Sequence, residues 1–169
     1  MTVTIRPETA DDFAPIREVI RLAFGQDDEG RLVDALRAGG HVQVSMLAEE
    51  DGRVVGHILF SELSIVEADR VIESVSLAPL AVAPSHQRRG IGSRLVTEGL
   101  RACRDVGCES VVVLGHPEYY PRFGFSAERA LPLRSPYAGP AFMAMELVPG
   151  ALEGVSGEVR YPPPFEALS

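Results

Sequence analysis

The sequence contains no lysine, and all 16 of its basic residues are arginine. This absence excludes a Walker-type phosphate loop, because that motif ends in Gly-Lys followed by Ser or Thr. It also excludes Schiff-base chemistry, which needs a lysine amine. The groups left to hold an anion are guanidinium groups and main-chain N–H groups.

Cysteine and histidine are also scarce. The two cysteines, Cys103 and Cys108, match neither a metal-ligand nor a redox spacing, so we expect both to pack against the core. The four histidines are scattered along the chain, and we therefore predict no metal site.

No apolar run is long enough to span a membrane. The start, "MTVTIRPETADDF", lacks the basic-then-apolar layout of a signal peptide, so we predict a cytoplasmic protein with no membrane partner. The net charge of −8 disfavours a nucleic-acid partner and is compatible with a cationic acceptor. A length of 169 residues suggests one domain with a full core.

Hydrophobic periodicity predicts alternating strands and helices. A strand over residues 2–7 precedes a helix that begins at Thr9 and carries apolar residues at helical spacing. The apolar positions of this helix are Phe13, Ile16, Ile20 and Phe24. A second helix is expected from Asp28 to Arg37, closed by two glycines.

The middle of the chain predicts a hairpin and a βαβ unit. Two β-like runs within residues 41–66 meet at Asp51-Gly52, a strong hairpin signal. A strand over Val75–Val82 is followed by a helix after Gly90, with Ile91, Leu95, Gly99, Cys103 and Val106 on one face and Gly107 at its end. The apolar run Ser110–Leu114 is typical of a buried parallel strand, which completes the unit.

Towards the end of the chain the elements become shorter. "PEYYPRFGF" predicts a short helical turn that leads into another strand, and "AFMAMELV" predicts a late strand. The prolines of the tail "GEVRYPPPFEAL" predict an extended segment lying across the surface. That segment is able to pack either on its own domain or across a homodimer interface.

Two close glycines mark the junction between a strand and a helix. Gly90 and Gly92 lack Cβ atoms, so a ligand can approach the main chain, and the first N–H groups of the helix carry partial positive charge. Arg88 and Arg89 add full charges beside them. The alternative is that the glycines only cap a turn and the arginines are only solvated. The position of the glycines after a strand and before an amphipathic helix favours the anion site, and a pyrophosphate is the expected ligand.

Two motifs in this order resemble those of the GNAT acetyltransferase superfamily. "LAPLAVAPSHQRRGIGSRLV" is similar to its core motif, Gln/Arg-x-x-Gly-x-Gly/Ala, filled by Gln87, Gly90 and Gly92. "EYYPRFGF" is similar to its second signature, an aromatic-Tyr pair that ends in Gly-Phe. The separation of the motifs and the order of elements over residues 1–148 also resemble the superfamily.

The resemblance implies acetyl-CoA as the donor substrate. It places the pyrophosphate on the main chain of the strand–helix junction, and it implies that the main chain of Val82 binds the pantetheine arm while the N–H of Leu80 faces the thioester carbonyl. The junction residues it implicates are Gln87, Arg88, Arg89, Gly90, Ile91, Gly92 and Ser93. Pro79, which lacks an N–H, is consistent with a strand that splays to admit the arm, or with a sheet edge.

By the same resemblance Tyr120 is the general acid that protonates the departing thiolate, and Tyr119 is expected to pack. The alternative is that both tyrosines pack under the short helix. Some superfamily members carry a glutamate base where this chain has Ser76. This departure leaves the base unassigned, with Glu62, Glu73 and His116 as candidates that the sequence does not separate.

By the same resemblance, the acceptor pocket is expected at the segment between the first two helices and at the loop before the last strand. Those segments hold Phe24, the acidic run Asp27–Glu29, and Tyr137. Such an acidic run is more often a solvated helix start than an amine site, and we favour that interpretation here.

Together these features predict a single-domain α/β GNAT-like fold, with a mixed, mostly antiparallel sheet, a splayed parallel strand pair and flanking helices. Residues 1–148 form the acetyltransferase domain and residues 149–169 an extension packed on it. The predicted activity is direct acetyl transfer from acetyl-CoA to a primary amine of a small molecule or protein.

Three other functions fit parts of the pattern. A dinucleotide-binding enzyme is disfavoured because the third glycine of its fingerprint falls on Leu95 and the next strand ends in Gly115-His116 rather than an acid. A non-catalytic CoA-binding regulator is favoured by Ser76 and opposed by Tyr120. An interaction protein that retains only the fold would show no affinity for CoA.

Overall fold

The protein folds around one mixed sheet, which the computed structural model describes for residues 2–168, with side chains described for residues 2–166. Within that range seven strands pair in the order β1-β2-β3-β4-β5-β6, and β7 joins β3. The strands are β1 (Val3–Pro7), β2 (Val42–Glu50), β3 (Arg53–Val66), β4 (Val71–Val82), β5 (Ser110–Leu114), β6 (Phe142–Glu146) and β7 (Glu158–Arg160). The helices are α1 (Phe13–Phe24), α2 (Asp28–Ala38), α3 (Ile91–Asp105) and α4 (Ala127–Ala130), with 3-10 turns that include η2 (Pro84–His86), η3 (Tyr120–Phe123) and η4 (Pro163–Leu168).

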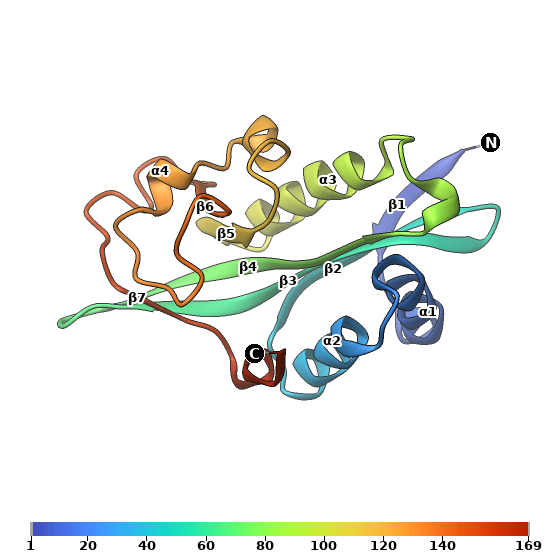
Figure 1. Cartoon of the computed structure of the whole chain (residues 1–169), viewed down its shortest axis with the longest axis horizontal. Coiled ribbons are helices and arrows are strands. Elements are labelled where there is room, and N and C mark those ends of the chain that lie inside the picture. The colour runs from blue at the N-terminus through green and yellow to red at the C-terminus, as the bar shows by residue number, and fades with distance from the viewer. Residues whose placement is uncertain (1, 169) are drawn as a thin grey trace.

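Helices cover both faces of this sheet. Figure 1 shows α3 on one face and α1 and α2 on the other, with the C-terminus on the side of α2. All pairings are antiparallel except that of β4 with β5. The predicted fold class, a mixed sheet with one parallel pair flanked by helices, is confirmed.

The β4–β5 pair is short. Its parallel register covers only Val75–Leu77 against Val111–Val113, although β4 continues to Val82. On its other side, the register of β4 with β3 shifts between the pairs Leu77↔Phe60 and Leu80↔Ile58, around Pro79. The two parallel strands therefore part after Leu77, which opens the sheet next to residues 78–82.

Local signals in the first half act as predicted, with one exception. Asp51 and Gly52 both take positive φ, 52° and 77°, as a two-residue turn between β2 and β3 requires. In α1, Ile16 and Ile20 are fully buried, but Phe13 and Phe24 are 39% and 40% exposed. Because both end positions remain partly exposed, the buried face of α1 is shorter than its periodicity indicated.

A hydrophobic core lies between α3 and the sheet. The α3 side chains that enter it include Leu95, Val96 and Leu100. Gly99 lies so close to β3 that a Cβ there would be 2.5 Å from Phe60 Cε1, so α3 can approach the sheet only with glycine at this position. Val106, expected on the same face, lies past the end of the helix and is 60% exposed.

Two predictions for the C-terminal third are wrong. The segment after Phe125 makes a single β-bridge, between Ser126 and Ala144, instead of a strand. It then forms the short helix α4, because the Ser126 hydroxyl accepts a hydrogen bond from Arg129 N (3.0 Å) and so caps a helical turn. The tail does not remain extended across the surface, because it adds β7 to β3 and then forms η4. Buried Val159 and Phe165 anchor these two elements, and their burial outweighs the extended preference of the neighbouring prolines.

A buried polar network holds α2 against β1 and β2. Both oxygens of Glu8 accept hydrogen bonds from Arg37 (2.7 and 3.0 Å), and Ser45 Oγ donates a third to Glu8. Because the single Ser45 proton is used in that bond, Ser45 Oγ accepts from His57 Nε2 at 2.8 Å. Burial lowers the pKa of His57, so the ring is neutral, with its proton on Nε2 and none on Nδ1.

We expect Glu8→Gln to destabilise the fold in a pH-dependent way. Burial by itself raises the pKa of Glu8, but the polar groups of His57, Arg37 and Ser45 outweigh it and lower the pKa from 4.5 to about 2. The carboxylate therefore stabilises the fold fully above pH 4.5, and this contribution is lost as the pH falls towards 2. In urea unfolding at pH 7, the free energy of unfolding of Glu8→Gln should be about 3 kcal/mol lower than that of the parent protein. This difference between the two proteins should become smaller below pH 4.5.

The control for that experiment is Glu18→Gln on the outer face of α1. Glu18 pairs with Arg21 at 2.5 Å, but both side chains are about half exposed, so the loss of this pair should leave the free energy of unfolding almost unchanged. Equal losses in the two variants would contradict a structural role for the buried network.

Candidate active site

The junction between β4 and α3 forms a cradle of main-chain donors. Gly90 is the N-cap of α3 with a φ of 79°, and Arg88 also lies in the left-handed region with a φ of 64°. The carbonyl of Gly90 accepts the first helical bond, from Arg94 N at 3.1 Å. The N–H groups of residues 91–93 therefore precede the first helical donor and are available to a ligand.

A cleft of about 380 Å³ lies over this junction. It contains most of the residues predicted to bind acetyl-CoA, together with three that the sequence analysis did not select. The predicted residues in its lining are Val82, Gln87, Arg88, Gly90, Ile91, Gly92 and Ser93, and the additional ones are His86, Tyr119 and Arg122.

Arg89 was expected to add its charge to the cradle, but its side chain turns elsewhere. Its guanidinium binds Glu50 at the end of β2, with a distance of 2.6 Å between Arg89 Nη2 and Glu50 Oε2. Glu50 also binds His86 Nε2 at 3.2 Å. This pair of contacts fixes the loop before α3 to the β2–β3 hairpin, and it leaves Arg88 and Arg122 as the guanidinium groups that line the cleft.

The register of β4 determines which of its main-chain groups face the open side. Ala83 N binds Val55 O at 2.9 Å, and the same register continues through Ala81↔His57. In an antiparallel ladder the alternate residues, here Leu80 and Val82, direct their N–H and C=O groups away from that partner. They point to the side where β5 has already parted from β4, and Val82 O there accepts a bond from Gln87 Nε2 at 3.2 Å.

The lining of the cleft fits a phosphate-bearing ligand closely. A Cβ added at Gly92 would lie 3.5 Å from Tyr119 Oη and 3.7 Å from Val82 Cγ2, so any longer side chain there would fill the cradle. Tyr119 Oη lies 3.0 Å from Ser93 Oγ, and the Arg122 guanidinium stacks 4.7 Å over the Tyr119 ring. Tyr119, which we expected to pack in the interior, therefore forms part of the cleft wall.

Tyr120 is buried beside the opening between β4 and β5. Its ring packs edge-on against Tyr119 (5.1 Å) and Phe125 (5.7 Å), and a Cβ at Gly115 would collide with it at 2.3 Å. Burial, and then the neighbouring Tyr119, raise the pKa of Tyr120 to about 12. Tyr120 is only 7% exposed, and it does not line the cleft over the junction, whereas its neighbour Tyr119 does.

The candidate bases are dispersed. Ser76 is buried and lies opposite Ser61 of β3, and Glu73 is exposed further along β4. Glu62 binds His41 Nδ1 at 2.6 Å, and His116 is exposed in the turn after β5. Neither Ser76, which replaces the expected glutamate, nor any of the three candidate bases Glu62, Glu73 and His116 lines the cleft over the junction.

The residues predicted for the acceptor pocket are also separated. Asp27 and Asp28 lie at the start of α2, where Asp28 pairs with Arg31 at 3.5 Å, and Glu29 accepts from Gln26 at 3.2 Å. This acidic run thus serves the helix start. Tyr137, by contrast, lines a second and larger cleft on the opposite face of the sheet.

Neither a metal centre nor a membrane span is found in the described part of the chain. In residues 2–166, no three His, Cys, Asp or Glu side chains lie close enough together to hold a metal ion. Between residues 2 and 168, none of the helices combines the length and the apolar character needed to cross a membrane.

Comparison with known proteins agrees with this geometry. The model of the acetyltransferase (GNAT) family matches residues 10–125, which include β4, α3 and both tyrosines. The chain belongs to the GNAT family. It is therefore an N-acetyltransferase by family, as the two sequence motifs predicted.

Several GNAT proteins are similar over nearly the whole chain. The N-acetyltransferase YhbS of Escherichia coli K12 is 37% identical over 160 residues, 93% of this chain and 95% of its own. The crystal structure of Escherichia coli YhbS in complex with CoA covers 97% of this chain and 92% of its own, at 35% identity and a TM-score of 0.90. A GNAT acetyltransferase of Brucella melitensis in complex with acetyl-CoA covers 97% and 98%, at 36% identity and a TM-score of 0.80.

Proposed function

We propose that this GNAT protein transfers the acetyl group of acetyl-CoA directly to a primary amine. The observation that carries the proposal is that two sets of free main-chain groups, one on the edge of β4 and one at the start of α3, lie next to each other. The open edge of β4, with Leu80 and Val82, leads directly into the donor cradle at Gly90 and Gly92. A ligand with a polar arm and a pyrophosphate satisfies both sets together, and the relatives with CoA and acetyl-CoA support this donor.

Each part of the cradle has a separate task in donor binding. The N–H groups of residues 91–93 and the positive end of α3 attract the pyrophosphate. Arg88 and Arg122, which both line the cleft, add positive charge. Val82 offers its main chain to the pantetheine arm, and Gln87, which binds Val82 O, holds the strand end in place.

Leu80 and Tyr120 act at the thioester. As the amine attacks, negative charge develops on the thioester oxygen, and the fixed N–H of Leu80 stabilises that charge without reorganisation. Tyr120 supplies a proton to the departing sulfur, and its raised pKa keeps the hydroxyl protonated at any physiological pH. The ammonium form of the amine must lose a proton before it attacks, and that proton is released to solvent.

Calorimetric titration of acetyl-CoA tests the donor assignment. We expect binding in the micromolar range, about −8 kcal/mol, and none with NAD. An assay for thiol release from acetyl-CoA with a panel of amines then tests the reaction. Acetyl-CoA binding without turnover of any amine would favour a non-catalytic regulator, and absence of binding would overturn the proposal.

A further inference from the structure

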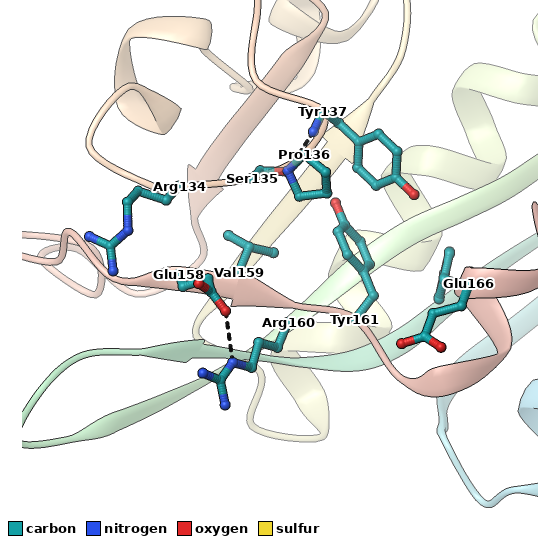
Figure 2. A pocket seen from close by; sticks show the side chains of 10 residues that line it. Arg134, Ser135, Pro136, Tyr137, Glu158, Val159, Arg160, Tyr161 and Glu166 are labelled. Carbon is teal, nitrogen blue, oxygen red and sulfur yellow. Dashed lines mark hydrogen bonds and ion pairs between the residues drawn. The ribbon is translucent and has the colours of Figure 1, made fainter. Parts of the chain in front are cut away.

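The face of the sheet opposite α3 carries a second cleft, of about 670 Å³. Three segments line it: residues 134–137, β7 with the following Tyr161, and the η4 turn with Phe165 and Glu166. Figure 2 shows Tyr137, Tyr161 and Glu166 gathered at one end, whereas Glu158, Arg160 and Arg134 lie at the other. All of this lining comes from the last quarter of the chain.

Main-chain hydrogen bonds fix the walls of the cleft. Arg134 N binds Gly157 O at 2.9 Å, and Val159 N binds Arg134 O at 2.8 Å, so the 134–137 loop is fastened to β7. The Ser135 hydroxyl accepts from Tyr137 N at 3.1 Å, which closes a tight turn before the aromatic ring. The cleft is therefore bounded by main chain held in place on both sides.

The inner end of the cleft is aromatic. Tyr137 and Tyr161 meet edge to face with ring centroids 5.4 Å apart, and Tyr161 meets Phe165 at 5.0 Å. Aromatic faces attract ammonium groups and also pack against hydrocarbon. At the outer end, Glu158 and Arg160 pair with each other at 2.9 Å, so their charges largely cancel.

The aromatic end shares a hydrophobic cluster with the reactive part of β4. Tyr161 and Phe165 belong to the same hydrophobic cluster as Ala78 and Ala81. These two alanines flank Leu80, whose N–H faces the opening between β4 and β5. Because β4 and β5 part after Leu77, the sheet is open beside this segment, and an amine held on the aromatic rings can reach the thioester through that opening.

We propose that this cleft binds the acceptor, and that the acceptor is a small primary amine with an aromatic or bulky hydrocarbon body. The inference rests on the proposed acetyl transfer and adds the substrate class. The volume suits a ligand of drug-like size rather than a folded protein surface, and the three rings suit an apolar body that ends in a cation. The net charge of −8 favours the approach of such a cation.

The reaction conserves atoms and charge. The lone pair of the neutral amine attacks the thioester carbon, a C–N bond forms and the C–S bond breaks. The nitrogen loses one proton to solvent, and the sulfur gains one from Tyr120, which is then reprotonated from solvent. The products are an N-acetylated amine and free CoA.

Steady-state kinetics with matched amines test the inference. 2-Phenylethylamine should be acetylated with a kcat/KM at least about tenfold that of ethylamine, because only the former occupies the aromatic end. Tyr137→Ala should raise the KM for 2-phenylethylamine about tenfold, whereas Tyr137→Phe, which keeps the ring, should stay within about twofold. Leu131→Ala is the control, since Leu131 belongs to the same loop region but is 78% exposed outside the cleft.

Calorimetry with acetyl-CoA, run on every variant, separates this inference from the donor assignment. Unchanged acetyl-CoA binding in Tyr137→Ala, with the KM effect confined to the amine, is the expected result. Equal kcat/KM for the two amines, a strong preference for a short peptide, or equal effects of Tyr137→Ala and Leu131→Ala would overturn the inference while the proposed activity stands. Failure to bind acetyl-CoA at all would overturn both.

Discussion

A Gly92→Glu variant should bind acetyl-CoA at least about 100-fold more weakly than the parent protein. The new side chain starts 3.5 Å from Tyr119 Oη and 3.7 Å from Val82 Cγ2, so it extends into the cradle. Its carboxylate occupies the place of the pyrophosphate and repels the negatively charged phosphates of acetyl-CoA. The loss of two charge-assisted hydrogen bonds, each worth about 1.5 kcal/mol or more, is sufficient for this effect.

The same substitution should not weaken the fold. Gly92 lies in the first turn of α3 and does not need a left-handed backbone, unlike Gly90 with its φ of 79°. An acidic residue in the first turn of a helix is favourable, and glycine there is unfavourable by about 0.5–1 kcal/mol relative to other residues. Gly90→Glu would combine strain with occlusion, so Gly92 is the cleaner position.

Thr97→Glu supplies the control for charge. Thr97 is exposed on α3 and lies outside the cleft, so the variant adds the same charge to the same helix. It should retain acetyl-CoA binding within about threefold in calorimetry, apart from a weak long-range repulsion. Comparable weakening in both variants would indicate a general charge effect, and intact binding in Gly92→Glu would show that the cradle is not the donor site.

A Tyr120→Phe variant should lose about 100-fold in kcat and keep its affinity for acetyl-CoA. General-acid catalysis contributes about 10² to 10⁴ in rate, and the phenylalanine ring preserves the packing against Phe125 and Gly115. Tyr119→Phe serves as the comparison, because it removes the hydroxyl that meets Ser93 in the cradle. That variant should raise the KM for acetyl-CoA and leave kcat within about threefold. Unchanged turnover in Tyr120→Phe would remove the acid role.

The pH dependence of the rate of the parent protein is an independent test of Tyr120 as the general acid. Because the pKa of Tyr120 is raised to about 12, its protonated form persists well above the ordinary range of tyrosine. The rate should therefore rise with pH as the amine loses its proton, whose pKa is about 10 for an alkylamine. It should show no alkaline decline below about pH 11, within the range where the protein remains folded. A decline near pH 9 would point to an acid other than Tyr120.

The sequence predicted those features that depend on neighbours along the chain. Asp51-Gly52 specifies its turn through two positive φ angles, and Gly90 and Gly107 bound α3 because other residues are strained there. The donor cradle is local too, since it consists of one strand end, one loop and one helix start. Its motif could therefore be recognised without any knowledge of distant contacts.

The features that escaped prediction depend on long-range contacts. Arg89 leaves the cradle because Glu50, far away in sequence, lies within 2.6 Å of it. Tyr119 and Tyr120 are adjacent in the chain, and only their packing against α3 and β5 decides which of them faces the cleft. β7 has three residues, too few to show a period, and it forms because β3 offers an unpaired edge beyond the end of β2.

The chain divides its two clefts between segments that share no residue. The family model matches residues 10–125, which contain the whole strand–helix junction, whereas every residue that lines the larger cleft lies between 134 and 166. An exchange of the C-terminal segment, by recombination in nature or by grafting in the laboratory, would thus replace the lining of the larger cleft and leave the strand–helix junction unchanged. Related proteins with this architecture can therefore differ in the proposed acceptor cleft while they keep the same site for the acetyl donor.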